Sequence, residues 1–364
     1  MSEMIYFPQT TPLANELRHI ITVEGAMPFE RYMALCLGHP RFGYYMTRDP
    51  FGVNGDFTTS PEISQMFGEL VGLWVADVWQ NMGSPLSFNL IELGPGRGTL
   101  MKDVLRSLKS LKGCLQAARV HLVEMSSVLQ VIQVETLKDH PVSWHQTIET
   151  LPDGLPNIII ANEFFDALPV RQYIRVKDHW HERTVALDPH GALHMSYAHA
   201  PEIIIEKRGE EGDILEVAPQ AVSCMATLAE RIRDDGGAFL CFDYGYVSGV
   251  NGDTVQALKA HQPIDVLACP GQADVTAHVN FSALKVAAQR FGCVVHGPIT
   301  QGDFLTNLGL NIRAAMLKKR ATTEQSYAID LAVERFLDHN DKGMGQLFKV
   351  MVVANPNVQE VIGI

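Results

Sequence analysis

The sequence predicts an α/β fold built around a mostly parallel sheet, and three stretches support this prediction. Residues 88–93 carry β-forming side chains on both faces, as a strand buried on two sides does, and 99–111 place leucine and valine at helical spacing. Residues 119–124 form the next strand and close a β-α-β unit, and 157–161 form a further buried strand. Strands that alternate with helices indicate a parallel sheet with helices on its faces.

The composition limits the class of protein. At 364 residues the chain is long for a single domain, so we expect one core with additions. The net charge of −12 argues against a general nucleic-acid binder and suits a basic partner, since the densest basic run is only 318–320. The six cysteines contain no Cys-x-x-Cys pair, which predicts neither zinc nor a disulfide framework. No secretion signal and no apolar run near ~20 residues occurs, so we expect neither export nor membrane insertion.

The pattern of elements predicts three regions. Residues 1–85 form an N-terminal helical extension, with helices at 11–23 and 29–37, and an active-site loop rich in Gly, aromatic and hydroxyl residues. Residues 86–300 form the core, with a β insertion at about 172–205 and a loop arm at about 249–280. Residues 301–364 add two helices within 304–335 and the final strand of the core sheet at 345–353. The inventory fits a seven-stranded sheet with one antiparallel member.

The turn after the first strand is the first candidate site. Glu92 stands two residues before Gly94, and Gly96 and Gly98 follow at alternate positions, where glycine lets the backbone approach a ligand closely. A dinucleotide fingerprint needs a glycine at the position of Thr99, so pyrophosphate binding is disfavoured. The spacing resembles the first motif of class I S-adenosylmethionine-dependent methyltransferases, whose cofactor carries a sulfonium and an ammonium that suit a carboxylate. The alternative is a tight turn with a buried, hydrogen-bonded Glu92.

Neighbouring segments supply further candidate cofactor contacts. Glu124 ends the second strand, where a ribose diol is normally held, although a solvated carboxylate is the alternative. Trp144, at the end of a strand at 142–145, could stack on an adenine or belong to the core. Asp56 and Thr59 precede a helix that we expect from Ser60 through residue 80, and they could reach the methionine end. For Ser60 we expect a helix-capping role.

A second chemical centre follows the strand at 157–161. Asn162 and Glu163 stand at the carboxyl end of this strand, which we expect beside the first strand, and Asp166 follows three residues later. Two carboxylates could hold a planar guanidinium, and Glu163 could accept its proton. We therefore take Glu163, Asp166 and Asn162 as catalytic candidates, with Asn162 also a cofactor contact. The alternative is that Asp166 caps a helix, a role that Asn would also fill.

Five histidines lie in or near the insertion but predict no metal site. They occupy turns and alternating faces without a compact ligand pair, so we expect solvated side chains. The residues are His179, His181, His190, His194 and His199.

Five longer motifs resemble the MidA-like methyltransferases. They are GDFTTSPEIS at 55–64, ELGPGRG at 92–98, ANEFFDALP at 161–169, DVTAHV at 274–279 and MGQLFK at 344–349. The resemblance runs nearly end to end, and it implies a class I methyltransferase sheet that binds S-adenosyl-L-methionine. The family includes a mitochondrial complex I assembly factor that symmetrically dimethylates an arginine of a complex I subunit. Asn280 stands where that family is expected to have Asp.

The resemblance implies a protein substrate presenting an arginine, such as a respiratory complex I subunit or its homologue, with a homodimer as one possible assembly. The alternatives are a small-molecule methyltransferase and a non-catalytic assembly factor that binds cofactor and partner without turnover. The start of the chain lacks an Arg-rich, acidic-poor transit pattern, so we expect a bacterial cytoplasmic protein, with the mitochondrial matrix as the location for a eukaryotic one.

Overall fold

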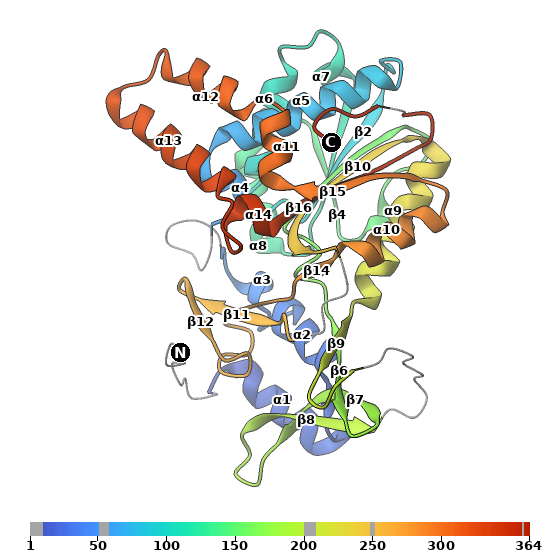
Figure 1. Ribbon diagram of the computed structural model, residues 1–364, viewed down its shortest axis with the longest axis vertical. Coiled ribbons are helices and arrows are strands. Elements are labelled where there is room, and N and C mark those ends of the chain that lie inside the picture. Colours follow the sequence, from blue (N-terminus) through green and yellow to red (C-terminus); the bar gives the residue numbers. More distant parts are fainter. Residues whose placement is uncertain (1–9, 51–57, 200–208, 248–251, 359) are drawn as a thin grey trace. The chain divides into compact units, whose positions relative to one another are not determined.

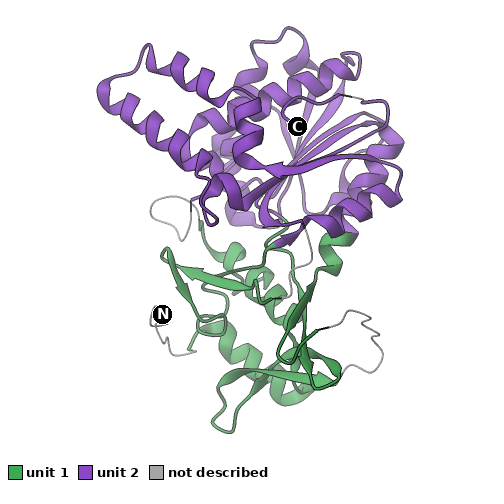
Figure 2. Ribbon diagram, in the orientation of Figure 1, with its two compact units in different colours: residues 1–57, 165–222, 248–278 green, residues 58–164, 223–247, 279–364 purple. Residues whose placement is uncertain are grey.

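The computed structural model describes residues 10–50, 58–199, 209–247, 252–358 and 360–364 (Figure 1). The chain forms two compact units (Figure 2). Unit 1 consists of residues 1–57, 165–222 and 248–278, and unit 2 consists of residues 58–164, 223–247 and 279–364. No helix in the described part of the chain has both the length and the apolar character needed to cross a membrane.

Unit 2 contains the predicted sheet. Its strand order is β15-β16-β10-β5-β2-β3-β4, and β16 is antiparallel to both neighbours while the other pairs are parallel. The strands are β2 (Phe88–Leu93), β3 (Ala118–Val123), β4 (Val142–His145), β5 (Asn157–Asn162), β10 (Gly237–Tyr246), β15 (Val294–Thr300) and β16 (Phe348–Ala354). A short eighth strand, β14 (Val279–Asn280), pairs with the end of β10. The prediction of seven strands with one antiparallel member is therefore confirmed for the main sheet.

Helices cover both faces of this sheet (Figure 1). The helices that lie wholly or mainly in unit 2 are α4 (Ser60–Ile63), α5 (Gln65–Asn81), α6 (Thr99–Leu108), α7 (Cys114–Ala117), α8 (Ser127–Thr136), α9 (Pro219–Asp235), α10 (Phe281–Arg290), α11 (Gln301–Asn307), α12 (Leu310–Lys318), α13 (Thr323–Leu337) and α14 (Met344–Leu347), with a 3₁₀ turn at Ile148–Thr150. Of these, α12 and α13 project away from the sheet in Figure 1. The sequence predicts two helices within 304–335, but the structure has three, α11, α12 and α13. Gly309, with a φ of +89°, separates α11 from α12.

The helix expected from Ser60 onward is divided in two. Ser64 has an extended backbone between α4 and α5, and its hydroxyl caps α5 by accepting the Met66 N–H. The expectation that Ser60 caps the helix is wrong, because Ser60 is the first residue of α4 and its hydroxyl makes other contacts.

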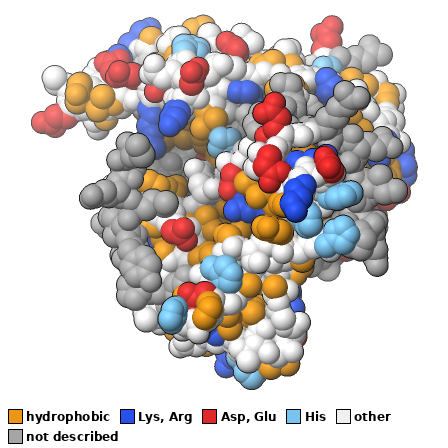
Figure 3. Space-filling view, turned by 60° about the horizontal axis from the view of Figure 1, so that its bottom comes forward, with side chains coloured by type: hydrophobic (Ala, Val, Ile, Leu, Met, Phe, Trp, Pro, Cys, Tyr) orange, Lys and Arg blue, Asp and Glu red, His pale blue; other side chains and the backbone are white. Residues whose placement is uncertain are grey.

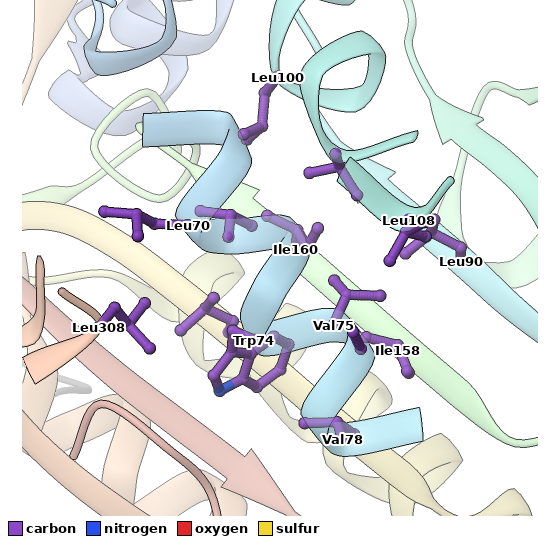
Figure 4. Close-up of a cluster of buried hydrophobic side chains, with 14 of the residues drawn as sticks. Leu70, Trp74, Val75, Val78, Leu90, Leu100, Leu108, Ile158, Ile160 and Leu308 are labelled. Carbon is purple, nitrogen blue, oxygen red and sulfur yellow. The ribbon is translucent and has the colours of Figure 1, made fainter. Parts of the chain in front are cut away.

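The core of unit 2 explains why its central strands are continuous apolar runs in the sequence. Ile158 and Ile160 of β5 pack against α5, where Trp74 is fully buried, in the cluster drawn in Figure 4. The alternate residues Ile159 and Ala161 are also fully buried, and they must face the opposite side of the sheet. In a strand buried on both faces, such as β5, apolar and polar residues do not alternate along the sequence.

Unit 1 combines three separate stretches of chain. Its helices are α1 (Pro12–Glu24), α2 (Phe29–Gly38) and α3 (Tyr44–Thr47). One antiparallel sheet contains β1 (Met27–Pro28), β6 (Arg171–Val176), β7 (His179–Leu187), β8 (Leu193–His199) and β9 (Ile214–Val217). The predicted hairpins are confirmed, and their residues share a core with the N-terminal helices through side chains such as Met33 and Val185.

The expected loop arm at 249–280 is wrong for its described part. A three-stranded antiparallel sheet forms there from β11 (Gln256–Lys259), β12 (Gln262–Ile264) and β13 (Asp274–Thr276). Ala257 and Val275 of this sheet enter the core of unit 1. Residues 252–278 are therefore a structural part of unit 1.

Candidate active site

The glycine turn joins β2 to α6, as predicted. Gly94, Gly96 and Gly98 have φ values of +60°, +53° and +79°, in the left-handed region that side chains other than glycine rarely adopt. A Cβ on Gly94 would lie 3.0 Å from the Phe164 ring, so a larger residue would meet two obstacles at once. The glycines thus allow a close turn at the carboxyl end of β2.

Glu92 is an unusual carboxylate for a buried strand. It is 3% exposed, and its Oε2 atom has no hydrogen-bond partner among the residues that the structure describes. Burial raises the pKa of Glu92 to about 8, and the Met101 backbone N–H only partly opposes this rise. Within the described part of the chain, Glu92 is therefore not fully hydrogen-bonded, in contrast to the alternative. The side chain is suited to a ligand that brings a cationic donor.

Glu124 stands directly after β3, at the predicted strand end. Its Oε1 accepts the Ser126 N–H at 2.7 Å, and its Oε2 accepts a hydrogen bond from the Gln133 amide at 3.1 Å. Glu124 is 8% exposed, so the alternative of a solvated carboxylate is wrong. Burial raises its pKa, and these hydrogen bonds act against the rise. Its carboxylate is consequently held in one orientation.

Trp144 belongs to β4 and is partly buried against the core. This agrees in part with the alternative that Trp144 is a core residue. Its indole Nε1–H donates to the Gln133 side-chain oxygen at 2.9 Å. The ring is therefore anchored close to the helix that supports Glu124.

The exit of β5 carries the acidic candidate Glu163. Its φ of +52° is uncommon for a residue with a side chain and marks local strain of a kind that clusters at functional sites. The Asn162 amide and the Ser60 backbone N–H both donate to Glu163 Oε1, at 3.1 and 3.3 Å. The fully buried Asp243 stabilises this turn by accepting the Phe164 N–H at 3.2 Å. Since β5 pairs with β2, Asn162 and Glu163 follow the strand next to the one that carries the glycine turn.

Asn162 also has an unused polar atom. Its residue is 8% exposed, and its Oδ1 has no hydrogen-bond partner within the described residues. Thr59 is buried next to Ser60 and makes no side-chain capping bond to α4. Asp56 lies outside the described residues.

Asp166 belongs to unit 1, whereas Glu163 belongs to unit 2. No helix begins between residues 163 and 170, so the helix-capping alternative for Asp166 is wrong, and with it the expectation that Asn would be tolerated for that reason. Within unit 1, the Asp166 carbonyl accepts the Ala277 N–H at 3.0 Å. Burial, followed by the charges of Asp274 and Asp166, raises the pKa of Tyr45, whose hydroxyl donates to Asp274.

Several residues at these turns were not predicted. The Gln133 amide also donates to the Gly96 carbonyl at 2.8 Å, so Gln133 connects the glycine turn with Glu124. Leu129 and Gln133 are the buried residues of α8, and the buried Leu137 follows as its C-cap, so the three recur every four residues. A polar residue in such an apolar stripe is the signal that could have identified Gln133.

Contacts from α4 form the other unpredicted group. Glu62 accepts hydrogen bonds from Thr99 at 2.5 Å and from Arg97 at 3.4 Å, which ties α4 to the glycine turn. The Ser60 hydroxyl donates to the fully buried Gln301 at 3.3 Å. The motif at 55–64 contains Ser60 and Glu62, but only the fold brings Gln301 to Ser60.

No group of three or more His, Cys, Asp and Glu side chains suited to a metal ion occurs within the described ranges. His181 and His199 lie opposite each other on β7 and β8, with ring centroids 5.4 Å apart. Histidine side chains are visible at the surface in Figure 3.

Comparisons with known proteins cover most of the chain. A family model described as "Putative S-adenosyl-L-methionine-dependent methyltransferase" matches residues 70–299. Protein arginine methyltransferase NDUFAF7, mitochondrial, of Danio rerio is 37% identical over 93% of this chain and 86% of that protein. The Homo sapiens protein of the same name is also 37% identical, over 93% and 82%. A crystal structure of a Burkholderia thailandensis protein bound to S-adenosyl-homocysteine has a TM-score of 0.85 and 28% identity, and the match covers 98% of this chain and 94% of that chain.

Proposed function

Because the chain belongs to the family of S-adenosyl-L-methionine-dependent methyltransferases, we propose that it methylates an arginine side chain of a protein, with symmetric dimethylarginine as the product. The observation that carries this proposal is the strained, hydrogen-bonded Glu163 at the end of the strand beside the glycine turn. Relatives at 37% identity are named protein arginine methyltransferases, which supports the same substrate class. By the family resemblance, the target is a respiratory complex I subunit or its homologue.

The residues at the glycine turn fit S-adenosylmethionine. Glu92 has a buried oxygen without a partner among the described residues, and the glycines that follow it hold the left-handed backbone of a close turn. Glu92 and the turn would hold the cationic methionine end, Glu124 the ribose and Trp144 the adenine. Asn162 and Thr59 are further candidate contacts. When bound, the cofactor supplies an electrophilic methyl group on a sulfonium.

Glu163 can make an arginine side chain more reactive towards a methyl donor. A guanidinium is a poor nucleophile because its lone pairs are delocalised and it carries a proton at neutral pH. A carboxylate can accept two of its N–H groups, orient the plane and take the proton that leaves when a new N–C bond forms. The Asn162 amide and the Ser60 N–H hold Glu163 Oε1 in place for this task. Asp166 remains a catalytic candidate on the sequence alone, since it belongs to unit 1 and Glu163 belongs to unit 2.

Alignment is the main contribution that we ascribe to the protein. Methyl transfer from a sulfonium disperses charge that is already present, so strong stabilisation of a new charge is not required. Holding donor and acceptor in line can contribute up to ~7–11 kcal/mol in favourable cases. The strained backbone of Glu163 is suited to this role because it aims the side chain before the substrate arrives.

The test is to map methylarginine in the proteins of cells that contain or lack this chain, and then to methylate the identified protein with purified enzyme. We expect one arginine to lose symmetric dimethylation in the absence of the chain and to regain it in vitro. A methylated product found only among small molecules would overturn the proposal in favour of a small-molecule methyltransferase. Unchanged methylation together with retained partner binding would indicate a non-catalytic assembly factor.

A further inference from the structure

Gln133 makes hydrogen bonds with three of the candidate cofactor contacts: the glycine turn, Glu124 and Trp144. Its amide nitrogen donates to the Gly96 carbonyl at 2.8 Å and to Glu124 Oε2 at 3.1 Å. Its side-chain oxygen accepts the Trp144 Nε1–H at 2.9 Å. One side chain thus connects the turn after β2, the end of β3 and the ring on β4.

The burial of Gln133 makes these contacts specific. The side chain is fully buried, and Leu129, one turn earlier in α8, and Leu137, the C-cap of α8, are almost fully buried as well. An amide in such a place is costly unless its donors and acceptor are paired, so an apolar residue would satisfy the packing more simply. Three matched contacts therefore indicate that Gln133 serves the groups it touches.

Gln133 and Ser126 act on Glu124 from two sides. The Ser126 N–H holds Oε1 and the Gln133 amide holds Oε2, so rotation of the carboxylate is restricted at both oxygens. A carboxylate has about four lone-pair positions, and these two bonds leave acceptor capacity on each oxygen. Two parallel acceptors match the two O–H donors of a vicinal diol.

We propose that Gln133 is a positioning residue that orients the Glu124 carboxylate so that it selects a ribose with both hydroxyl groups. The inference deepens the proposed role of Glu124 as the ribose contact and depends on it. It extends to Trp144 as well, because the same amide group orients the indole. Gln133 sets the arrangement without contacting the ribose.

The experiment measures binding of two probes by calorimetry, S-adenosylhomocysteine and its 2′-deoxyribose analogue. Loss of a hydrogen bond to a charged group weakens binding about 10- to 100-fold, so wild-type protein should prefer the ribose probe by about tenfold or more. Gln133→Leu should bind the ribose probe at least about tenfold more weakly, and its preference over the deoxy probe should fall below about threefold.

Gln130→Leu is the matched control. Gln130 lies on the same helix, and its amide donates to the backbone carbonyl of Glu124 at 2.8 Å and not to the carboxylate. We expect affinity and preference within about threefold of wild type. Thermal unfolding of each variant checks that the comparison is made between folded proteins.

Gln133→Glu provides a test that preserves size if Gln133→Leu does not fold. It places a second carboxyl beside Glu124, and the two would share a proton that is lost as the pH rises. The ratio of variant to wild-type affinity should therefore fall by about tenfold or more between pH 6 and pH 8. Other titratable groups on these elements, among them Glu92 and His145, are present in both proteins, so their contributions cancel in the ratio.

The outcomes distinguish failure of the positioning role of Gln133 from failure of the proposed ribose contact at Glu124. If Glu124→Ala retains wild-type affinity and preference, Glu124 does not hold the ribose and its proposed role fails. If Glu124→Ala loses both while Gln133→Leu keeps both, the positioning role of Gln133 is overturned. Equal weakening of both probes in Gln133→Leu, or equal losses in Gln130→Leu, would also overturn it, because either result indicates general damage. If the ratio of Gln133→Glu affinity to wild-type affinity does not change with pH, the positioning role of Gln133 is also overturned.

Discussion

Cofactor binding should release a proton from Glu92. In the ligand-free protein, burial raises the pKa of this carboxyl to about 8, and its Oε2 has no partner among the described residues. A cationic ligand stabilises the carboxylate, so binding must first remove the proton at neutral pH. At pH 7 about nine tenths of the groups carry a proton, and binding should release about 0.9 proton per site.

The affinity for S-adenosylmethionine should therefore increase with pH. The cost of ionising Glu92 decreases by ~1.4 kcal/mol for each pH unit below its pKa, which predicts about ninefold tighter binding at pH 7 than at pH 6. The ammonium of the cofactor stays largely charged in this range, since such groups titrate near ~8. The sign for folding is opposite. The folded protein holds this proton from the ordinary value of 4.5 up to about 8, so this contribution to stability is lost as the pH rises through that range.

Calorimetry in two buffers with different ionisation enthalpies counts the released protons directly. Glu92→Gln is the control, because it cannot ionise and should bind weakly at every pH without proton release. Micromolar binding by the wild-type protein with release of less than about 0.2 proton at pH 7 would refute the reasoning. Glu92 would then either remain protonated against the ligand or lie away from it.

Three further predictions concern single residues. Gly96→Val should abolish cofactor binding measured by calorimetry while the protein remains folded, because valine rarely adopts a φ of +53°; normal affinity would remove the turn from the site. Glu163→Gln should keep cofactor affinity but lower the single-turnover methylation rate by ~100-fold or more, and parallel losses of both would place Glu163 on the cofactor. Asn280→Ala should lower the unfolding free energy by about 1 kcal/mol in denaturant titration, because Asn280 caps α10 by accepting the Ala283 N–H; Asn280→Asp should be nearly neutral.

Periodicity and turn chemistry predicted the sheet because these signals are local. The strand at 157–161 and the glycines at 94, 96 and 98 are recognisable within a few residues, and the fold uses them as expected. Asn280 was less clear. Its departure from the family pattern raised a question of chemistry, and the structure shows a helix cap, a role that Asp and Asn both fill.

Contacts between distant segments could not be predicted in the same way. Gln301 meets Ser60 across 241 residues of sequence, and neither residue carries a local sign of the other. The strain at Glu163 is also invisible in the sequence, because a positive φ is inferred from glycine or asparagine and not from glutamate. Gln133 is intermediate, since its place in an apolar stripe was readable but its partners were not.

The core of unit 1 has a consequence for how the chain is made. Met33, Val185 and Val275 pack in one cluster, although roughly 240 residues separate the first from the last. At the ~5–20 residues per second of protein synthesis, the early helices wait about 10–50 s for their final partners. During that interval the apolar faces of α1 and α2 are exposed on the ribosome. These two helices, made before the rest of unit 1, are thus among its last parts to be completed, and a chain stalled before residue 275 should bind chaperones well.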